Sequence, residues 1–386
     1  MLNSIELILK LTERCNLNCK YCYYFNGLDQ SFKEKPAALK PLVLDKIINF
    51  LLRGIKDLNL KKMTIVFHGG EPLLLNKHLF DEYCNKLRNL LIPQLNELYL
   101  TVQTNGVLIN EEWIAIFKKH NIRLGISMDG TREYHDQFRV DHNNRGSYDK
   151  LMQAVTLLKK LNYDFGVLSV IDPSKDPELI FNHFIKDLEL NGVDFLWPDF
   201  THDNPPPYPA KMYGVFISKI LQMWVAHGDP NVRVRFVDSY VRMFLGKEGI
   251  IYGEGANSVP AYPIFVIRSD GEISPSDELM STEPSTVMKT GSNVEHTSLK
   301  DFFMLPIFKE LDNAVSIAPG KCLQCCWEKV CGGGGITNRF SKNNRFNNPS
   351  VYCDGLKMFF STVLQELIHA GVSVENIGKN LCIKTY

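Results

Sequence analysis

Strand-like and helix-like segments alternate along the first 200 residues, and this alternation constrains the fold more than any other feature. Six apolar segments are expected to be strands, at residues 5–11, 63–70, 97–106, 122–130, 163–170 and 193–200. Five segments between them repeat apolar residues at helical spacing, at residues 42–55, 77–91, 111–120, 147–161 and 177–190. Strict alternation is typical of a parallel sheet covered by helices, so we expect an α/β fold.

Small and polar residues end several of the expected strands. The second ends in Gly69-Gly70-Glu71, the third in Thr104-Asn105-Gly106, and the fourth in Ser127-Met128-Asp129-Gly130. In parallel α/β folds the ligand site lies beyond the carboxyl ends of the strands. We therefore expect these motifs to border one site, although each alone would be ordinary turn chemistry.

Three cysteines follow the first strand, in the stretch CNLNCKYC: Cys15, Cys19 and Cys22. A structural zinc ion requires four ligands, and a disulfide framework requires an even number of cysteines. A [4Fe–4S] cluster held by three cysteines keeps one iron free for an outside ligand. A zinc site or a functionless remnant remains the alternative for this loop.

The net charge and the N-terminal sequence argue against several classes of protein. The chain has no net charge at neutral pH, which gives no support for nucleic-acid or membrane-surface binding. Its N-terminus, MLNSIELILKLTERC, resembles neither a signal peptide nor a membrane span. We expect a cytoplasmic protein without a nucleic-acid or membrane partner, in which clustered cysteines bind metal rather than form disulfides.

The loop C-x3-C-x-aromatic-C, with Tyr21 before the last cysteine, resembles the signature of the radical S-adenosylmethionine (SAM) enzymes. HGGEPLL, QTNG, SMDG and HDQFR resemble the motifs that follow it in that family. The resemblance implies a partial (β/α)6 TIM-like barrel and SAM bound to the open iron. The SAM-binding residues that it implies are Tyr21, Gly70, Glu71, Asn105, Ser127 and Arg139, with Arg139 pairing with the SAM carboxylate.

A second group of cysteines lies near the C-terminus: Cys322, Cys325, Cys331 and Cys353. Four cysteines can close a zinc site or a [4Fe–4S] cluster equally well. The pattern resembles the SPASM extension of radical SAM peptide maturases, and residues 264–279 resemble its β-hairpin. That resemblance implies a closed auxiliary cluster. Cys326 is a spare thiol or an alternative ligand.

The chain departs from a complete SPASM extension at two positions. Ser276 and Gly335 stand where ligands of a second auxiliary cluster are found, and no cysteine occurs between residues 85 and 321. We therefore expect two [4Fe–4S] clusters in total, one that binds SAM and one auxiliary. The domains expected are a barrel at residues 1–206, a helical bridge at 207–250 and the cluster domain at 251–386.

The finer features CGGGG…RF…FNNPSVYC look most like the Xye-type branch, which joins an aromatic ring to a β-carbon in ribosomally made peptides. We expect an oxidoreductase that crosslinks a precursor peptide in this way, with an external electron donor. Alternatives within the superfamily are a formylglycine-generating sulfatase maturase and a thioether-forming maturase. An alternative from another class is a non-catalytic iron–sulfur electron carrier.

Residues 197–209 follow the sixth strand and contain several prolines. The segment is either a rigid crossover or part of the wall of the substrate channel. The crosslinking reaction needs a base to take a proton from the ring. Asp199, His202 and Asp203 are the candidates for this catalytic role.

Overall fold

The computed structural model describes residues 3–251 and 263–381. All six expected strands are present: β1 Ser4–Thr12, β2 Lys62–Gly69, β3 Glu97–Thr104, β4 Arg123–Ser127, β5 Phe165–Val170 and β6 Gly192–Leu196. Strands β1 to β4 pair in parallel in chain order, and β5 pairs in parallel with β6. The predicted α/β fold with parallel strands is confirmed.

Contacts divide the chain into two compact units. Unit 1 comprises Met1–Met128, Arg132–Phe165 and Pro263–Phe308, and unit 2 comprises Asp129–Thr131, Gly166–Tyr262 and Lys309–Tyr386. Each unit contains segments from both halves of the chain, whereas the predicted domain boundaries at residues 206 and 250 follow the chain. That three-part division stays a prediction.

In unit 1 the expected hairpin joins the sheet at the free edge of β1. Strand β8 (Ile264–Ile267) pairs in parallel with β1, and β9 (Glu272–Pro275) pairs antiparallel with β8. A short β10 (Ser292–Asn293) continues from β9. The sequence placed this hairpin within the C-terminal cluster domain, but its hydrogen bonds make it part of the unit that holds the first three cysteines.

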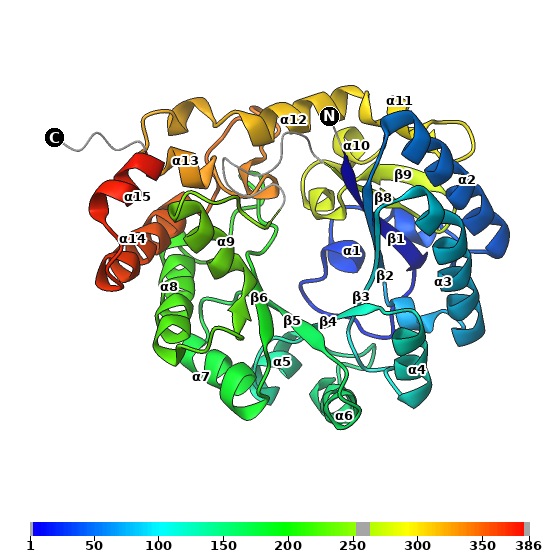
Figure 1. The fold of residues 1–386 in the computed structure, drawn as a ribbon, viewed down its shortest axis with the longest axis horizontal. Helices are drawn as coiled ribbons and strands as arrows, with labels where there is room; N and C mark the ends of the chain where they lie inside the picture. Colours follow the sequence, from blue (N-terminus) through cyan, green and yellow to red (C-terminus); the bar gives the residue numbers. More distant parts are fainter. Residues whose placement is uncertain (1–2, 252–262, 382–386) are drawn as a thin grey trace. The chain divides into compact units, whose positions relative to one another are not determined.

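The helices of unit 1 are α1 Tyr23–Asn26, α2 Pro41–Leu58, α3 Lys77–Leu91, α4 Glu111–Lys119, α5 Arg132–Phe138, α6 Tyr148–Lys160, α10 Pro284–Val287 and α11 Leu299–Phe303. Helices α2, α3 and α4 lie along one side of β1–β3 (Figure 1). Helix α2 begins with a proline at its first position and ends at Asn59, which has the left-handed conformation that stops a helix. Its apolar stripe, including Ile47 and Leu51, is buried.

The carboxyl end of strand β1 is buried on both faces, for two different reasons. Ile5, Leu7 and Leu9 alternate along one face and lie in the apolar core. Lys10 lies on the opposite face and is also fully buried. A buried lysine requires a partner charge, so this second face of β1 must line a polar interior.

The helices of unit 2 are α7 Pro177–Asn182, α8 Ala210–His227, α9 Arg235–Phe244, α13 Glu328–Cys331, α14 Cys353–His369 and α15 Val374–Leu381. Helix α12 (Pro306–Ser316) begins in unit 1 and ends in unit 2. Strand β7 (Arg233–Val234) pairs in parallel with β6. The helix expected at 177–190 is α7 followed by a π-helical turn at His183–Asp187. None of the helices in the described part of the chain combines the length and apolarity of a membrane span.

Candidate functional site

The loop of three cysteines directly follows β1 and runs into the short helix α1. Cys22 precedes that helix, and the nearby backbone N–H groups of Tyr24 and Phe25 lower the pKa of its thiol. The backbone N–H of Leu17 donates to the sulfur of Cys15 at 3.4 Å. Donors aimed at sulfur favour the thiolate, which is the form that binds metal. Burial works in the opposite direction and raises the pKa of both thiols, so a positive ion is needed to hold them deprotonated.

The turn after β2 fixes the start of this loop. The N–H of Gly70 donates to the carbonyl oxygen of Thr12 at 3.0 Å, and the N–H of Glu71 donates to that of Arg14 at 2.8 Å. A Cβ atom at Gly70 would lie 2.1 Å from the carbonyl oxygen of Arg14. Only glycine therefore allows the two loops to approach this closely.

The segment after α5 holds the other side of the loop. The N–H groups of Asn18 and Lys20 donate to the carbonyl oxygens of Val140 and Phe138, at 2.7 and 3.0 Å. Nε2 of His142 donates to the carbonyl oxygen of Cys15 at 2.9 Å. The sequence analysis did not identify His142. The cysteine loop is thus fixed by backbone contacts on two sides, as a preorganised ligand set requires.

Glu71 is almost fully buried and joins the ends of two strands. Its Oε1 accepts hydrogen bonds from the N–H of Leu73 at 3.0 Å and the hydroxyl of Thr104 at 2.7 Å. Its Oε2 accepts from the N–H of Asn105 at 2.9 Å. Burial raises the pKa of Glu71 to about 7, although these three donors lower it. The side-chain oxygens are therefore engaged by the protein, and a contact to SAM from Glu71 stays a prediction for its backbone.

The other predicted SAM-binding residues also lie in unit 1. Asn105 Nδ2 lies 3.8 Å from the sulfur of Cys15 and 2.9 Å from Oδ1 of Asn16. Ser127 ends β4 and accepts a hydrogen bond from Gln103 at 2.9 Å. The guanidinium of Arg139 lies over the ring of Tyr21, 5.4 Å from its centre, and its charge acts on Cys22. Their roles toward SAM stay predictions.

A group of charged and polar residues, which we call the interior cluster, lies beside the cysteine loop. It consists of the buried Lys10 and Asp277 and the half-buried Tyr23 and His68. Lys10 Nζ is paired with Oδ2 of Asp277 and lies 3.0 Å from Nδ1 of His68. The hydroxyl of Tyr23, the residue after Cys22, donates to the same Asp277 oxygen at 2.9 Å. Lys10 and His68 are neighbours in the β1–β2 register, so they share one face of the sheet.

The protonation states in the interior cluster follow from its charges. Burial alone would raise the pKa of Asp277, but Lys10 and then His68 hold that pKa well below its ordinary range. Burial and the nearby Lys10 lower the pKa of His68. Near neutral pH the cluster therefore presents an ionised carboxylate beside a neutral imidazole.

A cavity of about 280 Å³ opens next to Lys10 and Asp277. It is also lined by Tyr24 and Arg268, which with Glu13 form a second buried network. The guanidinium of Arg268 donates to both carboxylate oxygens of Glu13, at 3.0 and 3.3 Å. Asp277 is thus a buried carboxylate that borders open space and the cysteine loop. The sequence analysis missed it, although a lysine within the apolar run IELILKL indicated a hidden acidic partner.

The second group of cysteines lies in unit 2, where Cys322, Cys325, Cys331 and Cys353 interact electrostatically with one another. Burial raises the pKa of Cys331 to about 12, and the other three thiols raise it as well. Cys326 lies beside Cys325 and is exposed. The four predicted ligands are therefore brought together, and Cys326 faces solvent.

Both cysteine groups have the ligand type and number that a [4Fe–4S] cluster requires. Among residues 3–251 and 263–381, no three His, Cys, Asp or Glu side chains converge closely enough to hold one metal ion. The assignment of clusters to these cysteines stays a prediction.

The predicted base candidates follow β6 in unit 2 and are tied to the cluster-binding segment. Nε2 of His202 donates to the carbonyl oxygen of Pro349 at 2.8 Å, and Asp203 accepts from the N–H of Lys342 at 2.7 Å. Both are exposed, whereas Asp199 is half-buried. His202 and Asp203 thus anchor a loop, and a catalytic role for the three stays a prediction.

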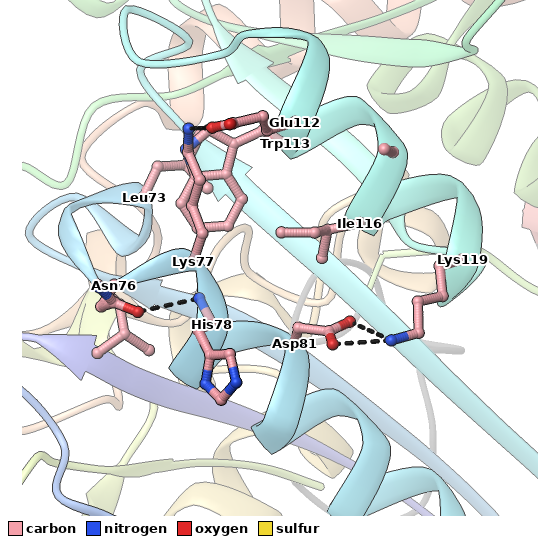
Figure 2. Close-up of a pocket in the computed structure, with 11 residues that line it drawn as sticks. Leu73, Asn76, Lys77, His78, Asp81, Glu112, Trp113, Ile116 and Lys119 are labelled. Atoms are coloured by element: carbon pink, nitrogen blue, oxygen red, sulfur yellow. Dashed lines mark hydrogen bonds and ion pairs between the residues drawn. The ribbon is translucent and has the colours of Figure 1, made fainter.

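A depression of about 840 Å³ in unit 1 lies between α3 and α4 (Figure 2). Its charged side chains are paired with one another. Lys119 binds Asp81, and Lys77 binds Glu112 (Figure 2). None of the predicted site residues lines it. It contains paired charges on an outer helical face.

Comparison with known proteins gives matches over nearly the whole chain. Residues 9–179 match the model of the radical SAM superfamily. The chain is 27% identical to the cysteine-type anaerobic sulfatase-maturating enzyme of Clostridium novyi, over 95% of this chain and 97% of that protein. It is 23% identical to the serine-type enzyme of Bacteroides thetaiotaomicron, over 90% and 86% of the two chains.

A solved structure, native anSMEcpe with bound AdoMet and Cp18Cys peptide, has the same fold. The TM-score is 0.81 at 24% identity, and the match covers 95% of this chain and 98% of that one. The superfamily match supports the predicted cofactors, SAM and [4Fe–4S] clusters. That Cys15, Cys19 and Cys22 hold the SAM-binding cluster stays a prediction. These matches do not extend to the predicted cyclophane branch.

Proposed function

Because residues 9–179 match the model of the radical SAM superfamily, we propose that the protein is a radical SAM maturase. It would oxidise the β-carbon of a cysteine or serine in a peptide to formylglycine. Asp277 carries this proposal: it is a buried, ionised carboxylate beside the cysteine loop and an open cavity. Similarity to cysteine-type and serine-type sulfatase-maturating enzymes over most of the chain supports the same chemistry.

The proposed oxidation removes a hydrogen atom, a proton and an electron from the peptide side chain. Bound SAM and its cluster would supply the radical that takes the hydrogen atom, and the auxiliary cluster would take the electron. Cys15, Cys19 and Cys22 would hold the first cluster, and Cys322, Cys325, Cys331 and Cys353 the auxiliary one. For cysteine, water then replaces sulfur, which leaves as hydrogen sulfide.

Asp277 would accept the proton from the substrate thiol or hydroxyl. Its carboxylate is already ionised because Lys10 compensates its charge in the buried interior. Tyr23 fixes the orientation of the same oxygen. We therefore prefer Asp277 to Asp199, His202 and Asp203 as the base, since two of those three side chains bind backbone groups.

The second candidate is the ring-to-β-carbon crosslink in a precursor peptide. The observation that favours it is Ser276 and Gly335, which stand where the ligands of a second auxiliary cluster would be. In either case we propose a peptide partner, an external electron donor and a cytoplasmic location.

The test is to incubate the reduced, iron-loaded protein and SAM with the Cp18Cys peptide and with its cysteine-to-serine variant. The proposed oxidation gives an aldehyde that a hydrazide probe traps, with release of hydrogen sulfide from the cysteine peptide. If the protein instead crosslinks an aromatic-rich peptide, mass spectrometry of the product should show the loss of two hydrogens and a fragment with a ring-to-β-carbon bond. No aldehyde would then be trapped.

Substitutions test the role of Asp277 as the base separately from SAM binding and cluster binding. Asp277→Asn should abolish aldehyde formation but retain SAM binding and both clusters, because the amide cannot take the proton. Asp270→Asn is the matched control, since Asp270 lies in the same hairpin and pairs with Lys35. If Asp277→Asn forms aldehyde at the parent rate, the assignment of the base is wrong.

A further inference from the structure

Arg339 is a buried cation near the second group of cysteines, at the end of the short 3-10 helix Thr337–Arg339. Only 3% of its surface is exposed. It lies in the NRF stretch of unit 2, to which the proposed function assigns no role. A guanidinium removed from water this completely requires an anion or a full set of acceptors.

The hydrogen bonds of Arg339 all go to neutral carbonyl oxygens. Its Nε donates to Phe346 at 3.0 Å, and its Nη1 donates to Ala314 at 2.6 Å and to Gly332 at 3.3 Å. Within the part of the chain that the structure describes, no carboxylate is paired with Arg339. These carbonyls accept from Nε and Nη1 but leave the positive charge of Arg339 uncompensated.

Among the described residues, the groups whose charge acts on Arg339 are the predicted ligands Cys322 and Cys331. Burial lowers the pKa of Arg339 to about 10, and the thiolates of Cys322 and Cys331 oppose that change. Gly332, which accepts from Arg339, directly follows Cys331. A Cβ at Gly333 would lie 3.3 Å from Nε of Arg339, so the guanidinium packs against the turn that follows Cys331. The charge of Arg339 therefore faces the ligand set.

Lys357 provides a natural comparison. It lies one turn after Cys353 in α14, and its charge also acts on Cys353 and Cys325. Its side chain is 49% exposed and lies 4.0 Å from Asp354. Water and a carboxylate screen the charge of Lys357, whereas nothing comparable screens that of Arg339.

We infer that Arg339 is the internal counter-charge of the [4Fe–4S] cluster held by Cys322, Cys325, Cys331 and Cys353, and that it raises the reduction potential of this cluster. The inference rests on the auxiliary cluster of the proposed function. Accepting one electron makes the cluster more negative by one charge. A fixed positive charge in a medium of low dielectric constant stabilises this reduced state more than the oxidised state. The substrate electron would thereby be accepted more readily.

The experiment is a redox titration of the auxiliary cluster alone. The full chain with Cys15, Cys19 and Cys22 replaced by Ala is reconstituted anaerobically, and the reduced cluster is followed by electron paramagnetic resonance. Arg339→Gln should lower the electron affinity of the cluster at least tenfold, which is 59 mV for a one-electron couple. Arg339→Lys should keep most of the parent potential, because it keeps the charge. Lys357→Gln should shift the potential much less.

Other results overturn the inference. If Arg339→Gln holds its iron and has the parent potential, Arg339 is only a structural tie between three carbonyls. If Arg339→Gln cannot hold iron, Arg339→Lys decides: a tenfold loss of electron affinity there would show that charge is not the cause. If the parent protein binds zinc in place of iron at these four cysteines, there is no auxiliary cluster, and the inference is wrong. If the variants shift the potential as expected but the parent protein forms no aldehyde, only the proposed function is wrong.

Discussion

At the scale of single residues, the candidate site depends on charges placed where water is scarce. Arg139 is 8% exposed, lies over Tyr21 and lowers the pKa of Cys22, where burial is the larger and opposing effect. Lys10 is fully buried beside Asp277. The predicted partner of Arg139 is the carboxylate of SAM. Charge-assisted hydrogen bonds to a carboxylate are about twice as strong as neutral ones.

Arg139→Ala should weaken SAM binding about ten- to a hundredfold, which corresponds to the roughly 1.5–3 kcal/mol of a hydrogen bond to a charged group. Equilibrium binding of SAM to the iron-loaded protein measures the effect. Arg132→Ala is the matched control, because Arg132 lies in the neighbouring helix α5 and pairs with Asp149 on the surface. An unchanged dissociation constant for Arg139→Ala would show that its predicted role is wrong.

At the scale of elements, the cysteine loop is held by the ends of neighbouring strands. Glu71 connects the end of β2 to Thr104 and Asn105 at the end of β3. Gly70 lets the β2 turn contact the backbone before Cys15. The motif GGE therefore acts here through close backbone approach and one buried carboxylate. A substitution of Glu71 should therefore disturb the ends of both β2 and β3.

Glu71 should make the stability of the protein depend on pH. Burial raises its folded-state pKa from 4.5 to about 7, so the folded protein holds a proton that the unfolded chain releases in this window. Its contribution to stability therefore falls as the pH rises from 4.5 to 7, by up to about 3 kcal/mol. Glu71→Gln lacks this titration.

Denaturant unfolding of the cluster-free protein, followed by tryptophan fluorescence from pH 4.5 to 7, measures this effect. The unfolding free energy of the parent minus that of Glu71→Gln should decrease with rising pH. Glu112→Gln on the surface of α4 is the control and should give a nearly constant difference. A constant difference for Glu71→Gln as well would contradict the raised pKa.

At the scale of the whole molecule, each compact unit holds one group of cysteines. Cys15, Cys19 and Cys22 lie in unit 1, and Cys322, Cys325, Cys331 and Cys353 lie in unit 2. The contacts that fix each group come from within its own unit. The two sites should therefore load iron independently, even though the proposed reaction uses both.

Anaerobically prepared protein should contain about eight irons per chain, from two four-iron clusters. Replacing Cys15, Cys19 and Cys22 together by Ala should leave about four. Iron and zinc analysis of both proteins provides the measurement, with Cys84→Ala as the control because Cys84 is fully buried in the apolar core. About twelve irons would reveal a third cluster, and stoichiometric zinc would make the second group a zinc site.

The amino-acid sequence by itself determined the features that depend on neighbouring residues. The alternation of strands and helices predicted the α/β fold, because periods of two and about 3.6 residues are local. The spacing of Cys15, Cys19 and Cys22 predicted the cluster loop for the same reason, since one short loop supplies all three ligands. The turn glycines at the strand ends could likewise be identified from their position after each apolar run.

Only the tertiary structure decided which distant residues share the site. Asp277 pairs with Lys10 across 267 residues of chain and with Tyr23 across 254, and no periodic pattern encodes such a contact. The β8–β9 hairpin brings Asp277 there by pairing with β1, although the sequence assigned it to another domain. Arg339 looked like an ordinary polar residue until its burial was known. Burial and partner charges set the chemistry of these groups, and both arise only when the chain has folded.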